Sequence, residues 1–439
     1  MRDYFERLAA GVCTLPAGLD RTSLSFSAED SDFLRFNKAL VRQATHVQQR
    51  YGTVSVVAGS RRASSTCALS GDADADLKLL LAERDQLARQ LPLVPEDPFL
   101  LLPDTVHSTE RVATGSLPTP AELIAEVTRL GAGTDLVGFY AAGPMVRGYA
   151  DSRGQRNWHA VESFHFEWCL YREADLAVKS SYAGAAFSAR ELAARMERAR
   201  AQLEVLGRPR KTLAPGAYRV CFSPVAVADL LATLSWGGFG ERAARTGVST
   251  LVQLQRGLQQ FHPAVRLTED IANGLAPAFQ DDGFVKPAQV ALVAEGRMAG
   301  TLVSPRSARE YGLASNGNAE EGPEALAMAP GSLPAADALK VLGTGVYLSD
   351  LHYLNYSDRQ ACRMTGMTRF ACLWVEDGVP VAPISVMRFD DSLLRMFGSG
   401  LVALTDRAEL VPDNATYGSR HLRSVSAPGA VVDGFVFTL

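Results

Sequence analysis

A short basic segment that contains prolines, residues 208–216, divides this chain of 439 residues into two halves with different patterns. The half before it mixes helix-type and strand-type periods, and the half after it carries mainly short apolar runs that are typical of strands. A chain of this length exceeds what one ordinary hydrophobic core organises. The sequence therefore predicts an α+β protein, with an α/β N-terminal domain over residues 1–207 and a β-rich C-terminal domain over residues 208–439.

Apolar spacing predicts two helices near the start of the chain. One face of the first is marked by apolar residues at intervals of three and four: Phe33, Phe36, Leu40, Ala44 and Val47. We expect a helix over residues 31–49 and a strand over residues 54–58. A second helix is expected over residues 77–91, and the prolines that follow end it.

Capping signals predict two more helices in the N-terminal half. Thr119 followed by Pro120 and Glu122 is a capping box with a first-turn proline, and it predicts a helix that ends near Gly131. Ser188 with Glu191 predicts a capping box for a long helix that ends at Gly207. Strands are expected between these helices, over residues 136–141, 164–171 and 174–183.

The C-terminal half is expected to hold one helix among short strands. A strand over residues 217–222 precedes a helix over residues 225–234, and further strands are expected over residues 289–293, 346–348 and 431–438. Asp377-Gly378 separates two apolar runs, as in a β-hairpin. Residues 312–334 have few periodic apolar positions and predict a long loop.

Composition excludes several classes of partner and location. With 44 basic and 48 acidic side chains the net charge is only −4, so no basic stripe for a nucleic acid is expected. The six cysteines form no CxxC pair and are expected to be reduced thiols. No segment has the pattern of a signal peptide or a membrane span, so we expect a cytoplasmic protein without membrane contact.

Residues 351–389, LHYLNYSDRQACRMTGMTRFACLWVEDGVPVAPISVMRF, combine a polar turn-rich segment with the hairpin around Asp377-Gly378. This stretch resembles a signature of the TldD/TldE (PmbA) family of zinc-metallopeptidase-related proteins. The resemblance covers most of the chain and is more specific from residue 208 onward. It implies the two-domain fold of the TldD/PmbA type.

Active members of this family carry an HExxxH helix that holds zinc, and a cysteine near the C-terminus completes the site. None of the seven histidines here is followed by glutamate or paired at helical spacing. The segment that matches the metal helix, residues 225–238, contains no histidine and one acid, Asp229. No cysteine follows Cys372.

The chain therefore resembles the metal-free TldE/PmbA subunit of the family. The resemblance implies a non-catalytic partner of a zinc-bearing TldD-like subunit, with no cofactor in this chain and with zinc in the partner. Its substrates would be extended peptides, such as unfolded proteins or ribosomal peptide precursors. The alternative is a stand-alone, homo-oligomeric enzyme or peptide-binding protein, which would need titratable groups that converge in one cavity, for instance His352, Asp358, Arg359 and Cys362.

Two polar segments beside the predicted hairpin are the candidate peptide-binding site. Their dense hydrogen-bonding groups suit an extended peptide that adds to a strand edge, and an ordinary surface loop is about as compatible with them. The candidate residues are Asn355, Tyr356, Ser357, Asp358, Arg359, Thr365, Gly366 and Arg369.

Two possible metal sites and a possible nucleophile in the sequence each have a structural alternative. Acids at residues 72, 74, 76 and 83 have calcium-loop spacing, but Leu77 occupies the position that needs glycine, which favours an acidic helix start. His159 and His165 would share one strand face with Glu167, either as a metal site or as hydrogen-bonded strand histidines. Cys362 and Cys372 are expected to be buried structural thiols rather than nucleophiles.

Overall fold

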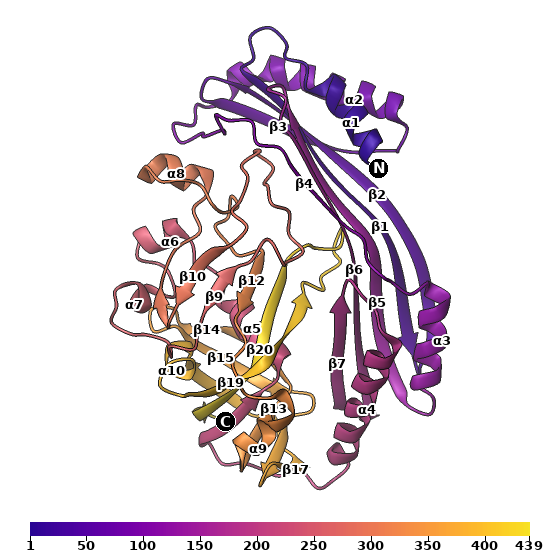
Figure 1. Ribbon diagram of the computed structural model, residues 1–439, viewed down its shortest axis with the longest axis vertical. Helices are drawn as coiled ribbons and strands as arrows, with labels where there is room; N and C mark the ends of the chain where they lie inside the picture. The colour runs from indigo at the N-terminus through magenta and orange to yellow at the C-terminus, as the bar shows by residue number, and fades with distance from the viewer.

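The computed structural model describes residues 1–439 and contains two β-sheets, one from each half of the chain. The first sheet has seven strands in the order β3-β2-β1-β5-β6-β4, and β7 pairs with the rest of β6. Its strands are β1 (Arg21–Asn37), β2 (Leu40–Ala58), β3 (Arg61–Ala68), β4 (Thr109–Ala113), β5 (Asp135–Asp151), β6 (Arg156–Glu173) and β7 (Leu176–Gly184). Figure 1 shows this sheet as a long curved layer.

Four helices accompany the first sheet. Three of them lie along its outer side, away from the C-terminal half, and the fourth lies beside β7 (Figure 1). They are α1 (Arg2–Val12), α2 (Ala73–Gln90), α3 (Pro120–Leu130) and α4 (Ala189–Leu206). This arrangement leaves the inner side of the sheet facing the rest of the molecule.

The helix predicted over residues 31–49 is wrong, because this segment forms the end of β1, a tight turn and the start of β2. Lys38 and Ala39 in the turn have positive φ angles of 51° and 58°, the geometry of a two-residue hairpin. Leu34 and Phe36 are buried on one face of β1, and residues 40–46 of β2 are exposed. The helical spacing was a coincidence of two strands that the turn separates.

Local capping signals placed α3 and α4 correctly, whereas α2 begins at Ala73, four residues before the predicted start. Thr119 and Glu122 form the complete capping box of α3. Ser188 caps α4 by accepting a hydrogen bond from the Glu191 backbone N–H, but the reciprocal bond from the predicted capping box is missing. The Glu191 carboxylate instead pairs with Arg195 at 2.7 Å.

The second sheet has thirteen strands, of which nine follow the order β11-β10-β9-β12-β20-β8-β13-β16-β17. The others branch from it: β18 and β19 pair with β20, β15 pairs with β18, and β14 pairs only with β15. The strands are β8 (Gly216–Phe222), β9 (Leu267–Glu269), β10 (Val290–Ala294), β11 (Arg297–Met298), β12 (Ala325–Met328), β13 (Gly345–Leu348), β14 (Asp350–Asp358), β15 (Arg363–Arg369), β16 (Leu373–Glu376), β17 (Val379–Pro383), β18 (Arg388–Ser392), β19 (Leu401–Pro412) and β20 (Ser424–Phe437).

Short helices complete the C-terminal half. They are α5 (Pro224–Leu234), α6 (Glu241–Arg245), α7 (Val252–Gln255), α8 (Pro305–Tyr311), α9 (Ala338–Leu342) and α10 (Leu393–Met396). The predicted hairpin at Asp377-Gly378 is confirmed as β16 and β17. The predicted loop over residues 312–334 is only partly irregular, because β12 within it pairs with β9 and β20.

The sheets and cores reproduce the expected α+β architecture, and the two halves pack directly on each other. The core under the first sheet contains Ala371 and Leu373 from the C-terminal half together with Phe166 and Trp168 of β6. No helix of the structure combines the length and the apolar character that crossing a membrane requires. The boundary at residues 207 and 208 stays a prediction, although the chain passes from one sheet to the other between β7 and β8.

Candidate functional site

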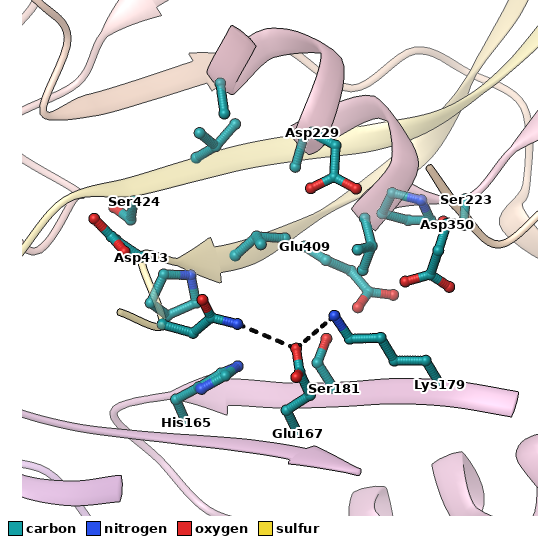
Figure 2. A pocket seen from close by; sticks show the side chains of 18 of the residues that line it. His165, Glu167, Lys179, Ser181, Ser223, Asp229, Asp350, Glu409, Asp413 and Ser424 are labelled. Carbon is teal, nitrogen blue, oxygen red and sulfur yellow. Dashed lines mark hydrogen bonds and ion pairs between the residues drawn. The ribbon is translucent and has the colours of Figure 1, made fainter. Parts of the chain in front are cut away.

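The main cavity lies between the two halves and has a volume of about 730 Å³. Pockets of this size commonly hold small molecules or parts of larger ligands. The N-terminal half contributes β6, β7 and α4 to its walls, and the C-terminal half contributes α5, the start of β14 and the end of β19. Figure 2 shows side chains from both halves pointing toward one another across this space.

Helix α5 forms one wall because its two faces differ in the size and polarity of their side chains. Ser223 starts the helix by accepting a hydrogen bond from the Ala226 N–H at 3.1 Å, and its hydroxyl donates to the Ser349 carbonyl at 2.6 Å. One face packs into the large C-terminal core, while Val225, Asp229 and other residues at helical spacing line the cavity. Asp229 is the only charged residue of this helix.

An ion pair lies on the opposite wall of the cavity. The Lys179 ammonium of β7 contacts the Glu167 carboxylate of β6 at 2.8 Å, and both side chains are mostly buried. Strand alternation places His165 and Glu167 toward the cavity while Phe166 and Trp168 enter the core. The Asn414 side-chain amide also donates to Glu167 at 3.2 Å, as the dashed lines in Figure 2 show.

Asp350, the first residue of β14, adds a second carboxylate from the C-terminal half. Its residue exposure is only 5%, and it forms no ion pair although it lines the cavity. Burial raises the pKa of Asp350 from 3.8 to about 6, and the nearby positive charge of Lys179 opposes this rise. Near neutral pH this carboxylate is therefore close to its titration range.

Asp229 titrates even closer to neutrality. Burial raises its pKa from 3.8 to about 7, the negative charge of Asp350 adds to the rise, and Lys179 opposes it. Figure 2 shows Asp229 descending from α5 toward the strand that carries Lys179. Two carboxylates with raised pKa values thus face a shared space.

The bases in the cavity have well-defined charges. Burial lowers the pKa of His165 to about 4, so its ring is neutral at physiological pH. Burial also lowers the pKa of Lys179, but the negative charges of Glu167 and Asp350 outweigh burial and leave it raised, so Lys179 is protonated. Lys179 is therefore a permanent positive charge among the carboxylates of Glu167, Asp229 and Asp350.

Comparison of the sequence with known protein families shows to which family the chain belongs. The family described as the PmbA/TldA metallopeptidase C-terminal domain matches residues 215–438, about half of the chain. The chain belongs to this family. No curated protein matches it.

Solved structures of similar fold extend over the whole chain. TldE from Thermococcus kodakarensis has a TM-score of 0.81 and 12% sequence identity, over 99% of this chain and 100% of that one. A proposed modulator of a DNA gyrase from Thermotoga maritima MSB8 has a TM-score of 0.76 and 13% identity, with 100% of both chains covered. A similarly described protein from Bacteroides thetaiotaomicron VPI-5482 has a TM-score of 0.76 and 13% identity, with 100% of this chain and 98% of that chain covered. Identities this low establish the shared fold.

The eight predicted peptide-binding residues of this PmbA/TldD-family chain lie on the β14–β15 hairpin or in its turn, and none lines the cavity. Five are exposed: Asn355, Ser357, Asp358, Arg359 and Arg369. Three have evident structural contacts. Tyr356 donates to the Thr233 carbonyl at 3.1 Å, Thr365 donates to the Phe389 carbonyl at 3.0 Å, and a side chain at Gly366 would collide with Phe389. Because β14 has an unpaired outer edge, strand addition here stays a prediction.

The residues in the cavity do not fit the zinc ion of catalytic family members. No group of three or more His, Cys, Asp or Glu side chains is arranged to hold a metal ion. Of the two alternatives for the strand histidines, the hydrogen-bonded one describes His159: its Nε2 lies 2.9 Å from the Leu275 carbonyl, and it does not line the cavity with His165 and Glu167. The calcium-type acids have structural roles: Asp72 caps α2, and Asp76 accepts hydrogen bonds from the Ser70 and Gly71 N–H groups.

The cysteines and other groups proposed for a stand-alone enzyme do not converge. Cys362 and Cys372 are buried, and burial raises the pKa of each thiol to about 12. His352 is exposed and lies against Tyr353, and Asp358 accepts backbone N–H bonds within its own turn. None of the four groups lines the main cavity.

Sequence reasoning missed the groups that do converge because they come from three distant segments of the chain: the β6–β7 hairpin, α5 and β14. Lys179, Asp229 and Asp350 carry no local motif, and Glu167 was considered only as a metal ligand. One signal was present: Asp229 is a lone acid in an otherwise apolar helix, at a place where a buried charge is costly. Such an acid indicates either a buried partner or a functional cavity.

Proposed function

We propose that this chain is a non-catalytic partner subunit of a heteromeric zinc metallopeptidase of the PmbA/TldD family. The observation that carries the proposal is the cavity face of α5. The resemblance matches this helix with the metal helix of catalytic members, and here it presents the single carboxylate of Asp229. Zinc and the hydrolytic step would belong to a TldD-like partner subunit.

The part of this chain would be to receive extended peptide from unfolded proteins or ribosomal peptide precursors. Two strand edges support this role. Three successive β7 residues, Lys179, Ser180 and Ser181, line the cavity, and β7 pairs with only one strand. The edge of β14 is also unpaired. An extended peptide binds such edges through its main chain. We further propose a cytoplasmic location without nucleic-acid partners, in keeping with the near-balanced charge.

Affinity purification of the tagged chain from its host, with mass spectrometry, tests the proposal. We expect a homologous chain with HExxxH and a late cysteine in stoichiometric amount. Casein hydrolysis should then require the partner and should stop on addition of a chelator. Chelator-sensitive hydrolysis by this chain alone would refute the proposal.

A second candidate function is a stand-alone homo-oligomeric enzyme or peptide-binding protein. It is favoured by the convergence of Glu167, Lys179, Asp229 and Asp350, because groups with shifted pKa values gather in functional cavities. Recovery of this chain by itself, as a defined oligomer in light scattering, would favour this candidate over the partner-subunit proposal.

A further inference from the structure

We propose that Asp229 and Asp350 bind a primary ammonium group of the peptide, either a lysine side chain or the N-terminus. This deepens, and rests on, the proposed role of the chain in receiving peptide. It assigns to the cavity a preference for peptides that present a primary amine, and this preference is independent of any metal.

The charge of the cavity lining leaves these two carboxylates without a cationic partner. Six carboxylate and four cationic side chains line the cavity. Three carboxylates are paired with lining cations, in the ion pairs Glu167–Lys179, Glu409–Arg195 and Glu320–Arg423. The remaining cation, Arg198, pairs with Glu191. Asp413 is exposed at the rim, so Asp229 and Asp350 are the unpaired acids of the interior.

Asp350 is the stronger indication of a ligand. It is nineteen-twentieths buried and points into the cavity, and no cation lies within ion-pair distance of it. A buried carboxylate without a cation is unfavourable, and such groups are normally paired or coordinated. The ammonium of Lys179, which could have paired with it, lies 2.8 Å from Glu167 instead. A ligand cation would supply the missing partner.

The charge and chemistry of the neighbours favour an ammonium over other ligands. Above about pH 7, where Asp229 and Asp350 are ionised, the formal charges of Glu167, Lys179, Asp229 and Asp350 sum to about −2, which repels anions. The side chains are not arranged to hold a metal ion. An ammonium has three donors on a compact point charge, which suits two carboxylates on different elements better than the planar fork of a guanidinium.

The cavity also has room for the aliphatic stem of a lysine. Val225, Ala228 and Ala232 of α5 line it with small apolar surface, and Trp236 at the end of this helix is about half exposed. Long basic side chains commonly lay their stems on such surface while the charged head reaches polar groups. The site therefore combines an apolar surface on α5 for the stem with the carboxylates of Asp229 and Asp350 for the ammonium group.

Binding of three peptides of one length to the purified full chain, measured by calorimetry, tests the proposal. One peptide has blocked ends and a central lysine, the second replaces this lysine with norleucine, and the third has a free N-terminus and no lysine. We expect the lysine peptide to bind at least about tenfold more tightly than the norleucine peptide, in line with hydrogen bonds to charged groups. A gain with the third peptide instead would assign the site to an N-terminus.

Two near-isosteric variants and one control locate the effect. Asp229→Asn and Asp350→Asn should each remove most of the lysine preference, while Glu320→Gln, which alters a paired carboxylate of the same cavity, should retain it. Circular dichroism checks that each variant is folded. If Asp350→Asn fails to fold, the partly exposed Asp229 still provides the test.

The pH dependence gives an independent readout. A cation binds the ionised carboxylates, so affinity for the lysine peptide should rise between pH 6 and pH 8 as Asp229 and Asp350 lose protons. The other groups facing them are His165, Glu167, Lys179 and the Arg195–Glu409 pair; His165 stays neutral and Lys179 protonated over this range.

The outcomes are decisive and separate from the partner-subunit question. Equal binding of all three peptides, no measurable binding of either amine-bearing peptide, or a preference for an amine-bearing peptide that survives both Asp variants would overturn the inference. These measurements use this chain alone, whereas the partner-subunit proposal depends on what co-purifies with it. Failure of one can therefore be told from failure of the other.

Discussion

Two regions of this molecule are rich in polar side chains, and they differ in how water reaches them. On the β14–β15 hairpin, residues such as Asn355 and Asp358 are exposed and accept hydrogen bonds from neighbouring backbone N–H groups. In the cavity, Asp229 and Asp350 are desolvated and their pKa values rise to about 7 and 6. Polar density along the sequence marked the hairpin, whereas convergence in space marks the cavity as the better candidate for chemistry.

The largest effect is expected from removal of the fixed cation in the cavity. Lys179→Met leaves Glu167 without its ion-pair partner and Asp350 without a nearby positive charge. We expect a loss of about 3 kcal/mol in the free energy of unfolding at pH 8, measured by urea denaturation.

An exposed pair provides the control for this substitution. Lys340→Met breaks the solvent-exposed contact with Asp337 and should change stability little. The loss with Lys179→Met should also shrink at pH 5, because the unpaired carboxylates can take up protons. Equal effects of the two substitutions would contradict the contrast between the cavity and the surface.

Removal of the Asp229 charge should stabilise the fold. Because its folded pKa lies above the ordinary value of 3.8, the native state binds the proton more tightly than the unfolded chain. The stability that the protonated Asp229 side chain adds to the folded state is fully present below about pH 4 and is lost as the pH rises through 7. Asp229→Asn should therefore be more stable than wild type at pH 8 by about 2 kcal/mol, and the difference should vanish near pH 4.

Thermal unfolding at several pH values measures this difference directly. A variant that is less stable than wild type at pH 8 would show that the charged form of Asp229 has a favourable partner in the folded protein. That result would remove the case for an unpaired acid.

A moderate effect is expected in the hairpin, at a residue with a structural contact. Tyr356→Phe removes the hydroxyl that donates to the Thr233 carbonyl and lies 3.3 Å from the Thr250 hydroxyl. We expect a loss of about 1 kcal/mol in stability from chemical denaturation. Tyr353→Phe, at a residue that is 76% exposed, is the matched control and should be neutral.

The smallest effect is expected at the exposed end of the hairpin. Arg359 lies over the Tyr356 ring at 5.4 Å and forms no ion pair. Arg359→Ala should change stability by less than about 0.5 kcal/mol. Peptide binding to this variant can be measured by calorimetry. If binding weakens severalfold, the hairpin also contacts peptide, and the hairpin and the cavity then both contribute to peptide binding.

Local signals predicted much of the fold but little of the site. The caps at Thr119 and Ser188 predicted the starts of α3 and α4, because a cap depends only on neighbouring residues. The false helix over residues 31–49 arose because apolar spacing alone does not reveal the turn at Lys38 and Ala39, whose positive φ angles are unusual for these residue types.

The cavity could not be predicted in the same way. Glu167 and Lys179 are neighbours on the β6–β7 hairpin, but only the packing of the two halves of the chain brings this pair to Asp229 and Asp350. Their pKa values depend on burial, which no local pattern of residues fixes. The family resemblance, in contrast, rested on contiguous residues and is confirmed by the match over residues 215–438.

Cross-linking of a photoreactive, lysine-containing peptide to the full chain, with mass spectrometry of the products, tests most directly whether the cavity receives peptide. We predict cross-links to the cavity walls, at Val225 and Trp236 of the α5 region and at Ser181 of β7, and competition by the unmodified lysine peptide. Cross-links confined to residues 355–369, with none in the cavity, would contradict the account and return the site to the hairpin.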